Sequence, residues 1–341
     1  MLLELILVGL GIALLMKGAD FLVDGSSRIA KKFNIPEIVI GLTIVAIGTS
    51  LPELVISIDS AMKGLSDISM GNVVGSNFAN LFFIISLCAV IKPITIKRET
   101  KLIENPLTIL CTALLYFISM NDGVISRYEG IALLVMTLLY ILYNVVMSKV
   151  GNKFDEEDEK TIKRQKKKQQ KNSKFTKKSI LVKLQENHPL IYSIVQILLG
   201  IICLKFGGDL VVDNAILIAE TLGLSEKLIS LTIVAFGTSL PELITCVSAT
   251  KKGETDLAVG NIIGSQVFNI LLIIGSAAAI TPIQGVRGYK DEMMILLIGT
   301  IIFAMLPFIG QKNKVGRTSG IAFVSFYLIY MCSLVYENLQ L

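Results

Sequence analysis

Apolar stretches of about 15 to 25 residues recur along the whole chain and are separated by short polar segments. A helix needs about 20 mostly apolar residues to cross the hydrocarbon core of a bilayer. The pattern therefore predicts an all-α, polytopic membrane protein with ten transmembrane helices. The expected spans are 2–22, 37–62, 68–91, 106–120, 129–148, 189–212, 226–250, 256–280, 293–309 and 319–336.

The composition excludes several classes of protein. Apolar residues make up 53% of the chain and charged residues 17%, and the mean hydropathy is +0.69. A typical soluble domain has about 25% charged residues, so a soluble enzyme, a nucleic-acid binder and a secreted disulfide scaffold are excluded. The five cysteines lie singly in apolar stretches, where thiols behave as small hydrophobic groups. The stretch Leu2–Met16 lacks a basic leader and a small-residue cleavage site, so we interpret it as the first span.

The positive charge is concentrated in one polar segment. Between Lys149 and Glu186, 13 basic and 6 acidic residues give a net charge of +7, whereas the whole chain carries +5. A nucleic-acid interface would instead spread its basic residues over a domain. We predict that residues 149–188 form a loop between a first five-helix repeat, 1–148, and a second, 189–341. Contact with anionic lipids would add about 1 kcal/mol per basic residue.

Lysine and arginine residues are distributed unequally between the two sides of the predicted spans. If the basic loop lies in the cytoplasm, the loops on its side carry 25 Lys and Arg residues and the opposite loops carry 5. Cytoplasmic loops of membrane proteins carry an excess of these residues. The bias predicts a multi-pass protein of the cell membrane, with a cytoplasmic basic loop and both termini outside.

The two halves of the chain are repeats of each other. Residues 42–94 align without gaps with residues 231–283 at a shift of 189, and about half of the positions are identical. Both copies contain Gly-Thr-Ser-Leu-Pro-Glu followed by Gly-Asn-x-x-Gly-Ser. An odd number of spans per copy makes the second copy cross the membrane in the opposite sense. We therefore predict an inverted repeat, which is typical of secondary transporters that bind substrate near the midplane.

The Gly-Thr-Ser-Leu-Pro-Glu motif lies in the middle of a predicted span. Glycine costs about 1 kcal/mol in a helix interior and proline about 3 kcal/mol, and Pro52 removes a backbone hydrogen bond. We expect the helix to break here and to leave carbonyls around Ala46 without a backbone partner. At membrane depth such carbonyls are tolerated only where they contact protein or line a water-filled cavity. Glu53 and its repeat Glu242 add two carboxylates, each costing at least a few kcal/mol at mid-bilayer. A cation would satisfy both kinds of oxygen.

The next span of each repeat supplies further oxygen atoms. Ser76 and Asn80 are four residues apart and share a helix face, as do Ser265 and Asn269. Small glycine pairs precede them and would let helices approach closely; they are Gly71, Gly75, Gly260 and Gly264. An all-oxygen site with two carboxylates suits a hard cation, and it favours calcium because calcium accepts irregular shells of about 6–8 oxygens. Soft metals are disfavoured because no Cys or His takes part.

These paired motifs resemble the sodium/calcium exchangers of the cation/calcium antiporter superfamily, and the resemblance covers nearly the whole chain. It implies that one calcium and several sodium ions compete for overlapping positions, with alternating access driven by sliding of the first and sixth helices. The resemblance is to a prokaryotic type. The loop 149–188 is too short for the calcium-sensing domains of animal relatives, so we expect no large regulatory domain. The implied ion ligands are Ala46 (carbonyl), Thr49, Ser50, Glu53, Ser76, Asn80, Ala235 (carbonyl), Thr238, Ser239, Glu242, Ser265 and Asn269.

Asn269 departs from part of that family, because some exchangers, including potassium-dependent ones, carry Asp at this position. With Asn the site holds two formal negative charges, so potassium dependence is not expected. Exchange of three sodium ions for one calcium ion is the family expectation. Such exchange is electrogenic, and moving its one net charge is worth about 2.3 kcal/mol per 100 mV.

The function predicted here is Na⁺/Ca²⁺ antiport that normally extrudes Ca²⁺, by a monomer without enzymatic activity or a resident cofactor. A proton/calcium exchanger on the same fold is the nearest alternative, and its carboxylates would titrate during transport. An uncoupled cation channel is the other alternative, against which the inverted repeat and the paired broken helices argue.

Four aspartates outside the motif also repeat at the shift of 189. They lie towards the ends of the first and sixth spans, where we expect helix-end hydrogen bonds or gating contacts. They are Asp20, Asp24, Asp209 and Asp213.

Overall fold

The computed structural model describes residues 2–150, 189–221, 235–309 and 313–339. The first half consists of α1 (Leu2–Phe33), α2 (Glu37–Ile40), the π-helical turn η1 (Gly41–Val45), α3 (Ala46–Thr49), α4 (Leu51–Met62), α5 (Ser66–Phe78), η2 (Ala79–Ile84), α6 (Ile85–Ile91), β1 (Ile94–Thr95), η3 (Thr100–Glu104), α7 (Asn105–Asn121), β2 (Val124–Ile125) and α8 (Arg127–Val150). The predicted basic loop, 149–188, lies almost entirely outside the described residues.

The second half repeats this succession of elements. It consists of α11 (Pro189–Thr221), α13 (Ala235–Gly237), α14 (Leu240–Lys252), α15 (Thr255–Phe268), η6 (Asn269–Ile274), α16 (Gly275–Ile280), β3 (Ile283–Gln284), η7 (Val286–Tyr289), α17 (Lys290–Met305), β4 (Lys314–Val315) and α18 (Arg317–Leu339). The strand β1 pairs with β4, and β2 pairs with β3. Exchanging the two repeats turns one pairing into the other, so the short strands follow the same pseudo-two-fold symmetry as the sequence.

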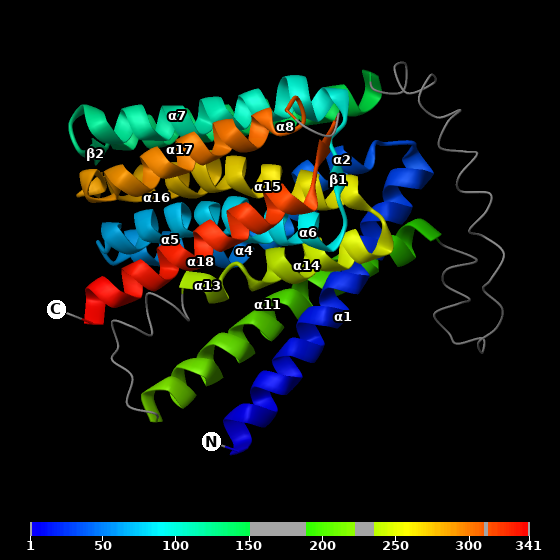
Figure 1. The fold of residues 1–341 in the computed structure, drawn as a ribbon, viewed down its shortest axis with the longest axis horizontal. Coiled ribbons are helices and arrows are strands. Elements are labelled where there is room, and N and C mark those ends of the chain that lie inside the picture. Colours follow the sequence, from blue (N-terminus) through cyan, green and yellow to red (C-terminus); the bar gives the residue numbers. More distant parts are fainter. Residues whose placement is uncertain (1, 151–188, 222–234, 310–312, 340–341) are drawn as a thin grey trace.

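The two strand pairs lie at opposite ends of the helix bundle (Figure 1). We call the end with β1 and β4 the β1 face and the end with β2 and β3 the β2 face. Among the described residues, the segment after β1 places two lysines on the β1 face. Lys101 Nζ donates to Asn313 Oδ1 at 2.8 Å, and Lys97 forms an ion pair with Asp256 at 3.1 Å.

Seven described helices are long and apolar enough to cross a membrane, and a bent pair formed by 37–49 and 51–62 would make eight. Of the ten predicted spans, 226–250 falls partly outside the described residues, and α17 is a 16-residue helix. The predicted first and sixth spans end too early, because α1 continues to Phe33 and α11 to Thr221. Packing extends α1 beyond its apolar stretch, since Val23, Ser26 and Ala30 are all buried.

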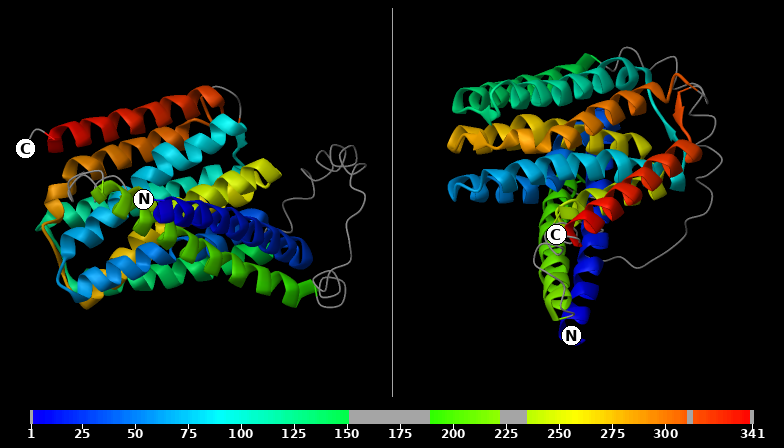
Figure 2. Two further views of the ribbon diagram at one scale, coloured as in Figure 1. Left: turned by 90° about the horizontal axis from the view of Figure 1, so that it is seen from below. Right: turned by 60° about the vertical axis from the view of Figure 1, so that its left-hand side comes forward.

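The helices α1 and α11 form a pair that runs across the other helices (Figure 2). Glycines allow their backbones to meet. A Cβ atom at Gly11 would lie 2.8 Å from the Gly207 carbonyl, and one at Gly18 would lie 2.9 Å from the Gly200 carbonyl. Residue numbers at these contacts rise along α1 and fall along α11. The two helices are therefore antiparallel, as an inverted repeat requires.

The helix α15 lies at the centre of the bundle, and every residue from Leu257 to Phe268 is buried. It packs closely against the first broken helix, because a Cβ atom at Gly264 would lie 2.7 Å from the Leu42 carbonyl and 2.7 Å from Ala46 Cβ. A Cβ atom at Gly260 would lie 3.0 Å from Gly41 Cα. The predicted close approach is thus confirmed for Gly260 and Gly264. In the first repeat it is wrong, because Gly71 faces the Tyr289 side chain and nothing lies within 4 Å of a Cβ atom built at Gly75.

Candidate functional site

Both repeats contain a broken helix at the Gly-Thr-Ser-Leu-Pro-Glu motif. Ser50 separates α3 from α4, and the two segments are bent by 48°. In the second repeat Thr238 and Ser239 separate α13 from α14. Proline stands in the first turn of α4 and of α14, where it needs no N–H partner. The predicted breaks are therefore confirmed.

The expectation that the break frees the Ala46 carbonyl is wrong, because this carbonyl is hydrogen-bonded. It accepts a hydrogen bond from the Ser50 N–H at 3.0 Å and another from the Thr49 hydroxyl at 3.3 Å. The reason is that the bend at Ser50 preserves the helical hydrogen bond to the residue four positions earlier. The backbone group that Pro52 deprives of a partner is the Gly48 carbonyl. In the second repeat the Ser239 N–H donates to Phe236 at 3.2 Å.

Glu53 and Glu242 are each 1% exposed and lie close enough for their charges to interact. The Ser50 hydroxyl joins the two repeats, because it donates to Glu242 Oε1 at 2.9 Å and lies 3.0 Å from Ser265 Oγ. Ser76 lies beside Glu53 in the first repeat. The structure thus brings three of the predicted hydroxyl ligands, Ser50, Ser76 and Ser265, together with the two carboxylates.

Many oxygen atoms around the motif are buried without a hydrogen-bond partner among the described residues. Such orphaned groups are rare in folded proteins and call for an explanation, one of which is an unseen ion. Seven belong to residues that the sequence singled out: Glu53 Oε2, Ser76 Oγ, Asn80 Oδ1, Thr238 Oγ1, Ser239 Oγ, Glu242 Oε2 and Asn269 Oδ1. All seven are oxygens, which is the donor set that a hard cation takes.

The amide of Asn269 is oriented by a residue that the sequence analysis did not single out. Asn269 Nδ2 donates to Asn77 Oδ1 at 3.0 Å, which leaves Asn269 Oδ1 as the unpartnered end of the amide. Asn77 is 1% exposed. No sequence signal identified it, because the equivalent position in the second repeat is Gln266.

Asn72 and Asn261 were also missed as positioning residues, although both copies of the Gly-Asn-x-x-Gly-Ser motif contain them. Asn72 Nδ2 donates to the Glu53 carbonyl at 3.1 Å and to Ser57 Oγ at 3.0 Å. The Thr49 hydroxyl donates to Asn261 Oδ1 at 3.0 Å. Each asparagine therefore ties the helix after the motif to a broken helix. The sequence contained a signal for them, because both repeats have asparagine at this position, 189 residues apart.

Each Ser–Asn pair, whose two residues were predicted to share a helix face, ends at the start of a π-helical turn. Asn80 lies at the start of η2, and Asn269 is the first residue of η6. A π-helical turn rotates the residues that follow relative to a regular α-helix, and such turns often occur at functional sites. Their placement beside both asparagines repeats with the sequence.

The site as described suits an ion held by two carboxylates and by neutral oxygens. Among the described residues no group of three or more His, Cys, Asp or Glu side chains could hold a metal. The hydroxyls of Thr49, Ser50 and Ser265 already make hydrogen bonds. Neutral oxygens without a hydrogen-bond partner among the described residues belong to Ser76, Asn80, Thr238, Ser239 and Asn269, whose amide nitrogen alone is hydrogen-bonded. Ala235 begins α13. The arrangement can bind a dehydrated cation of charge up to +2 without excess charge.

Comparison with known proteins agrees with this geometry. The family model described as sodium/calcium exchanger protein matches residues 3–148 and 192–336. The inner membrane protein YrbG of Escherichia coli is 33% identical over 335 residues, which cover 98% of this chain and 97% of YrbG. The sodium/calcium exchanger MaX1 of Methanosarcina acetivorans is 31% identical, with coverage of 96% of this chain and 97% of MaX1.

Solved structures of the sodium-calcium exchanger NCX_Mj have the same fold. One of them, soaked with Na⁺ and Ca²⁺, superposes with a TM-score of 0.80 at 29% identity and covers 97% of this chain and 98% of NCX_Mj. The family consists of exchangers and not of catalytic enzymes. The chain is therefore a membrane protein of the sodium/calcium exchanger family, a cation/calcium antiporter.

Proposed function

We propose that the chain exchanges Na⁺ for Ca²⁺ across the cell membrane by alternating access and normally extrudes Ca²⁺. The observation that carries the proposal is the set of seven buried oxygens without a hydrogen-bond partner, two of which belong to the buried carboxylates of Glu53 and Glu242. Two carboxylates balance one Ca²⁺ or two Na⁺, and a third Na⁺ makes the exchange electrogenic. The names of MaX1 and NCX_Mj give sodium and calcium for those two proteins, and this chain has the oxygen set to take the same ions.

The ligands in this proposal are the twelve residues predicted from the sequence. Glu53 and Glu242 supply the charge, and hydroxyl and amide oxygens complete the shell. Asn269 supplies a neutral oxygen because Asn77 holds its amide nitrogen. For that reason we do not expect K⁺ to be required. The carbonyl of Ala46 becomes available only if its hydrogen bonds with Ser50 and Thr49 open on ion binding.

We also propose that the β1 face is cytoplasmic, with both termini outside and the repeats 1–148 and 189–341 joined by the loop 149–188. The described lysines Lys97 and Lys101 on the β1 face support this orientation. In this arrangement anionic lipids bind the basic loop, and the chain works as a monomer with transported ions in place of a cofactor.

Uptake of radioactive Ca²⁺ into proteoliposomes tests the function. Vesicles loaded with Na⁺ and diluted into Na⁺-free buffer are expected to accumulate Ca²⁺, whereas vesicles loaded with K⁺ are not. Setting the membrane potential with valinomycin then reports whether the exchange is electrogenic. Uptake driven by an imposed pH gradient and indifferent to Na⁺ would instead identify a proton/calcium exchanger, and uptake that needs no counter-ion would identify a channel.

Ser50→Ala is expected to raise the Ca²⁺ concentration for half-maximal uptake by about tenfold. The Ser50 hydroxyl is buried and donates to Glu242 at 2.9 Å, and a hydrogen bond to a charged group is worth about 1.5–3 kcal/mol. Ser86→Ala is the matched control, because the Ser86 hydroxyl is equally buried but donates to the Leu81 carbonyl. Equal half-maximal concentrations in the two variants would exclude Ser50 from the ion site.

A further inference from the structure

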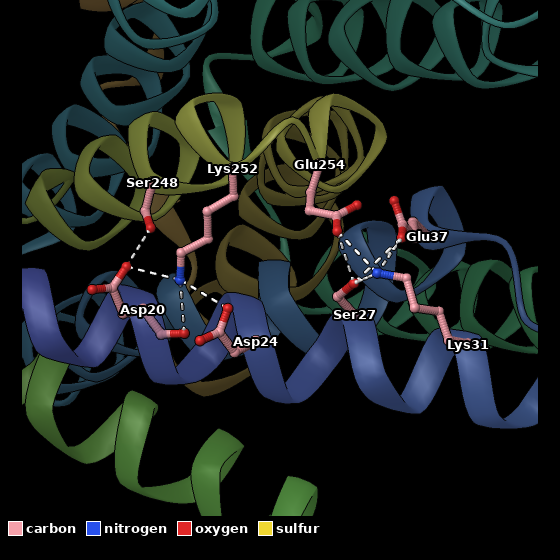
Figure 3. Close-up of polar contacts among 8 residues, drawn as sticks. All are labelled: Asp20, Asp24, Ser27, Lys31, Glu37, Ser248, Lys252 and Glu254. Atoms are coloured by element: carbon pink, nitrogen blue, oxygen red, sulfur yellow. Dashed lines mark hydrogen bonds and ion pairs between the residues drawn. The ribbon is translucent and has the colours of Figure 1, made fainter. Parts of the chain in front are cut away.

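One face of α1 carries a row of polar side chains towards the β1 face. Asp20, Asp24, Ser27 and Lys31 are spaced by four, three and four residues, so they lie on the same side of the helix. Figure 3 shows them directed at partners on α14, on α2 and on the turn before α15. These contacts tie the α1–α11 pair to the rest of the bundle.

Lys252 at the end of α14 makes the first set of contacts. Its ammonium lies 2.9 Å from Asp20 Oδ1 and 2.9 Å from Asp24 Oδ1. Ser248, one turn earlier, donates to Asp20 Oδ1 at 2.9 Å. The Lys252 side chain is 29% exposed, so water screens these ion pairs only in part. We call this arrangement, formed by Lys252, Asp20 and Asp24, the β1 lock.

Lys31 makes the second set of contacts. Its ammonium lies 3.0 Å from Glu254 Oε1 and donates to Ser27 Oγ at 2.7 Å, and Glu37 is 3.7 Å away. Burial works against the ionised form of Glu254. The hydrogen bonds with Glu37, Lys31 and Ser27 and the charge of Lys31 outweigh burial and lower the pKa of Glu254.

The β1 lock has an identical set of counterparts in the other repeat. At the shift of 189, Lys252 corresponds to Lys63, Asp20 to Asp209 and Asp24 to Asp213. The contacts around Lys31 have no such counterpart, because Leu65 stands at the position of Glu254 and Ile216 at that of Ser27. Only the three residues of the β1 lock are therefore built into both halves of the fold.

The counterparts are paired differently in this structure. Lys63 forms an ion pair with Asp59 on its own helix at 2.6 Å, and Asp209 pairs with Lys205 on its own helix at 2.8 Å. Asp213 is exposed and makes no ion pair among the described residues. The inter-helix lock is thus closed on the β1 face, and its equivalent on the β2 face is open.

In an inverted-repeat transporter, the two repeats exchange conformations when access changes sides. We propose that Lys252 with Asp20 and Asp24, and Lys63 with Asp209 and Asp213, are two alternating locks that set which face of the membrane the ion site opens to. The inference rests on the proposed antiport function. The closed β1 lock belongs to the state that is open towards the β2 face. Closing the β2 lock requires Lys63 to leave Asp59 and the β1 lock to open.

The two locks are not of equal strength, because one residue differs between the repeats. Ser248, which donates to Asp20 in the β1 lock, corresponds to Asp59. In a closed β2 lock the Asp59 carboxylate would stand next to Asp209, where it repels that carboxylate and competes for Lys63. The chain therefore rests with the β1 lock closed, and Asp59 is the residue that sets this preference.

Hydrogen–deuterium exchange of the purified full-length protein tests the proposal without a transport assay. Lys252→Gln is expected to speed exchange about three- to tenfold at the β1 face, in residues 20–33 and 248–256, since partly exposed ion pairs are individually weak. The same variant is expected to slow exchange at the β2 face, in 57–63 and 205–215, because the β2 lock then closes. Lys252→Arg should restore the wild-type pattern.

Asp59→Ser provides a second variant that leaves the β1 lock intact. It is expected to shift exchange in the same direction as Lys252→Gln, whereas Lys63→Gln should leave the β1 face protected. If exchange became faster at the β1 face but not slower at the β2 face, Lys252 would only hold two helices together, and the proposal would be wrong. An unchanged exchange pattern in both variants would also overturn it. A failure of Na⁺ coupling in vesicles would leave these exchange patterns unaffected, so the two proposals fail separately.

Discussion

Replacing Glu242 with Gln is expected to abolish Ca²⁺ uptake while the protein still folds. The substitution keeps the size of the side chain and can retain the contact with Ser50. It removes one of the two charges that balance Ca²⁺, and Glu242 is buried, with only 1% of its surface exposed. Removing one partner of a buried charge pair costs about 3–5 kcal/mol, which lowers ion affinity at least about a hundredfold.

The measurement is uptake of radioactive Ca²⁺ into Na⁺-loaded proteoliposomes, together with the thermal stabilisation of the purified protein by Ca²⁺. The uptake and the stabilisation by Ca²⁺ should both disappear in Glu242→Gln. An ion stabilises a folded protein by mass action only if it binds to it. Asp291→Asn is the matched control, because Asp291 is an exposed acid in the first turn of α17. Uptake by Glu242→Gln at the wild-type rate would contradict the assignment of the ion site.

The main features of the site could be predicted from sequence because duplication amplifies a weak signal. A single Pro52 in an apolar span predicts only a kink, and a single Glu53 predicts only an expensive charge. Their gap-free repetition at Pro241 and Glu242 made a structural accident improbable. The structure then places both glutamates in the interior, next to the breaks.

Other features of the site depend on contacts that a repeat pattern does not encode. The Asn77–Asn269 hydrogen bond joins residues of opposite repeats and breaks the internal symmetry, since Gln266 replaces Asn77 in the second copy. The ends of α1 and α11 depend on tertiary packing, which hydropathy does not report. The π-helical turns beside Asn80 and Asn269 depend on a local shift of backbone hydrogen bonds that has no marker among apolar side chains.

Gly264→Val is expected to disrupt folding, because α15 depends on direct contact with the backbone of the first broken helix. Even a Cβ atom at this position would lie 2.7 Å from the Leu42 carbonyl, and a backbone group has little room to move. Overpacking a core typically costs about 1–3 kcal/mol, and valine adds two methyl groups beyond Cβ. We therefore expect the midpoint of thermal unfolding to fall by about 5 °C or more.

Thermal unfolding can be followed through the chain's own buried thiols. Cys88, Cys111 and Cys246 are buried and become reactive towards a fluorescent maleimide only when the bundle opens. Gly9→Val is the matched control on α1, because nothing lies within 4 Å of a Cβ atom built at Gly9. If Gly264→Val unfolded at the same temperature as this control, the close approach of α15 to Leu42 could not be what positions Ser265 and Asn269 against the broken helix.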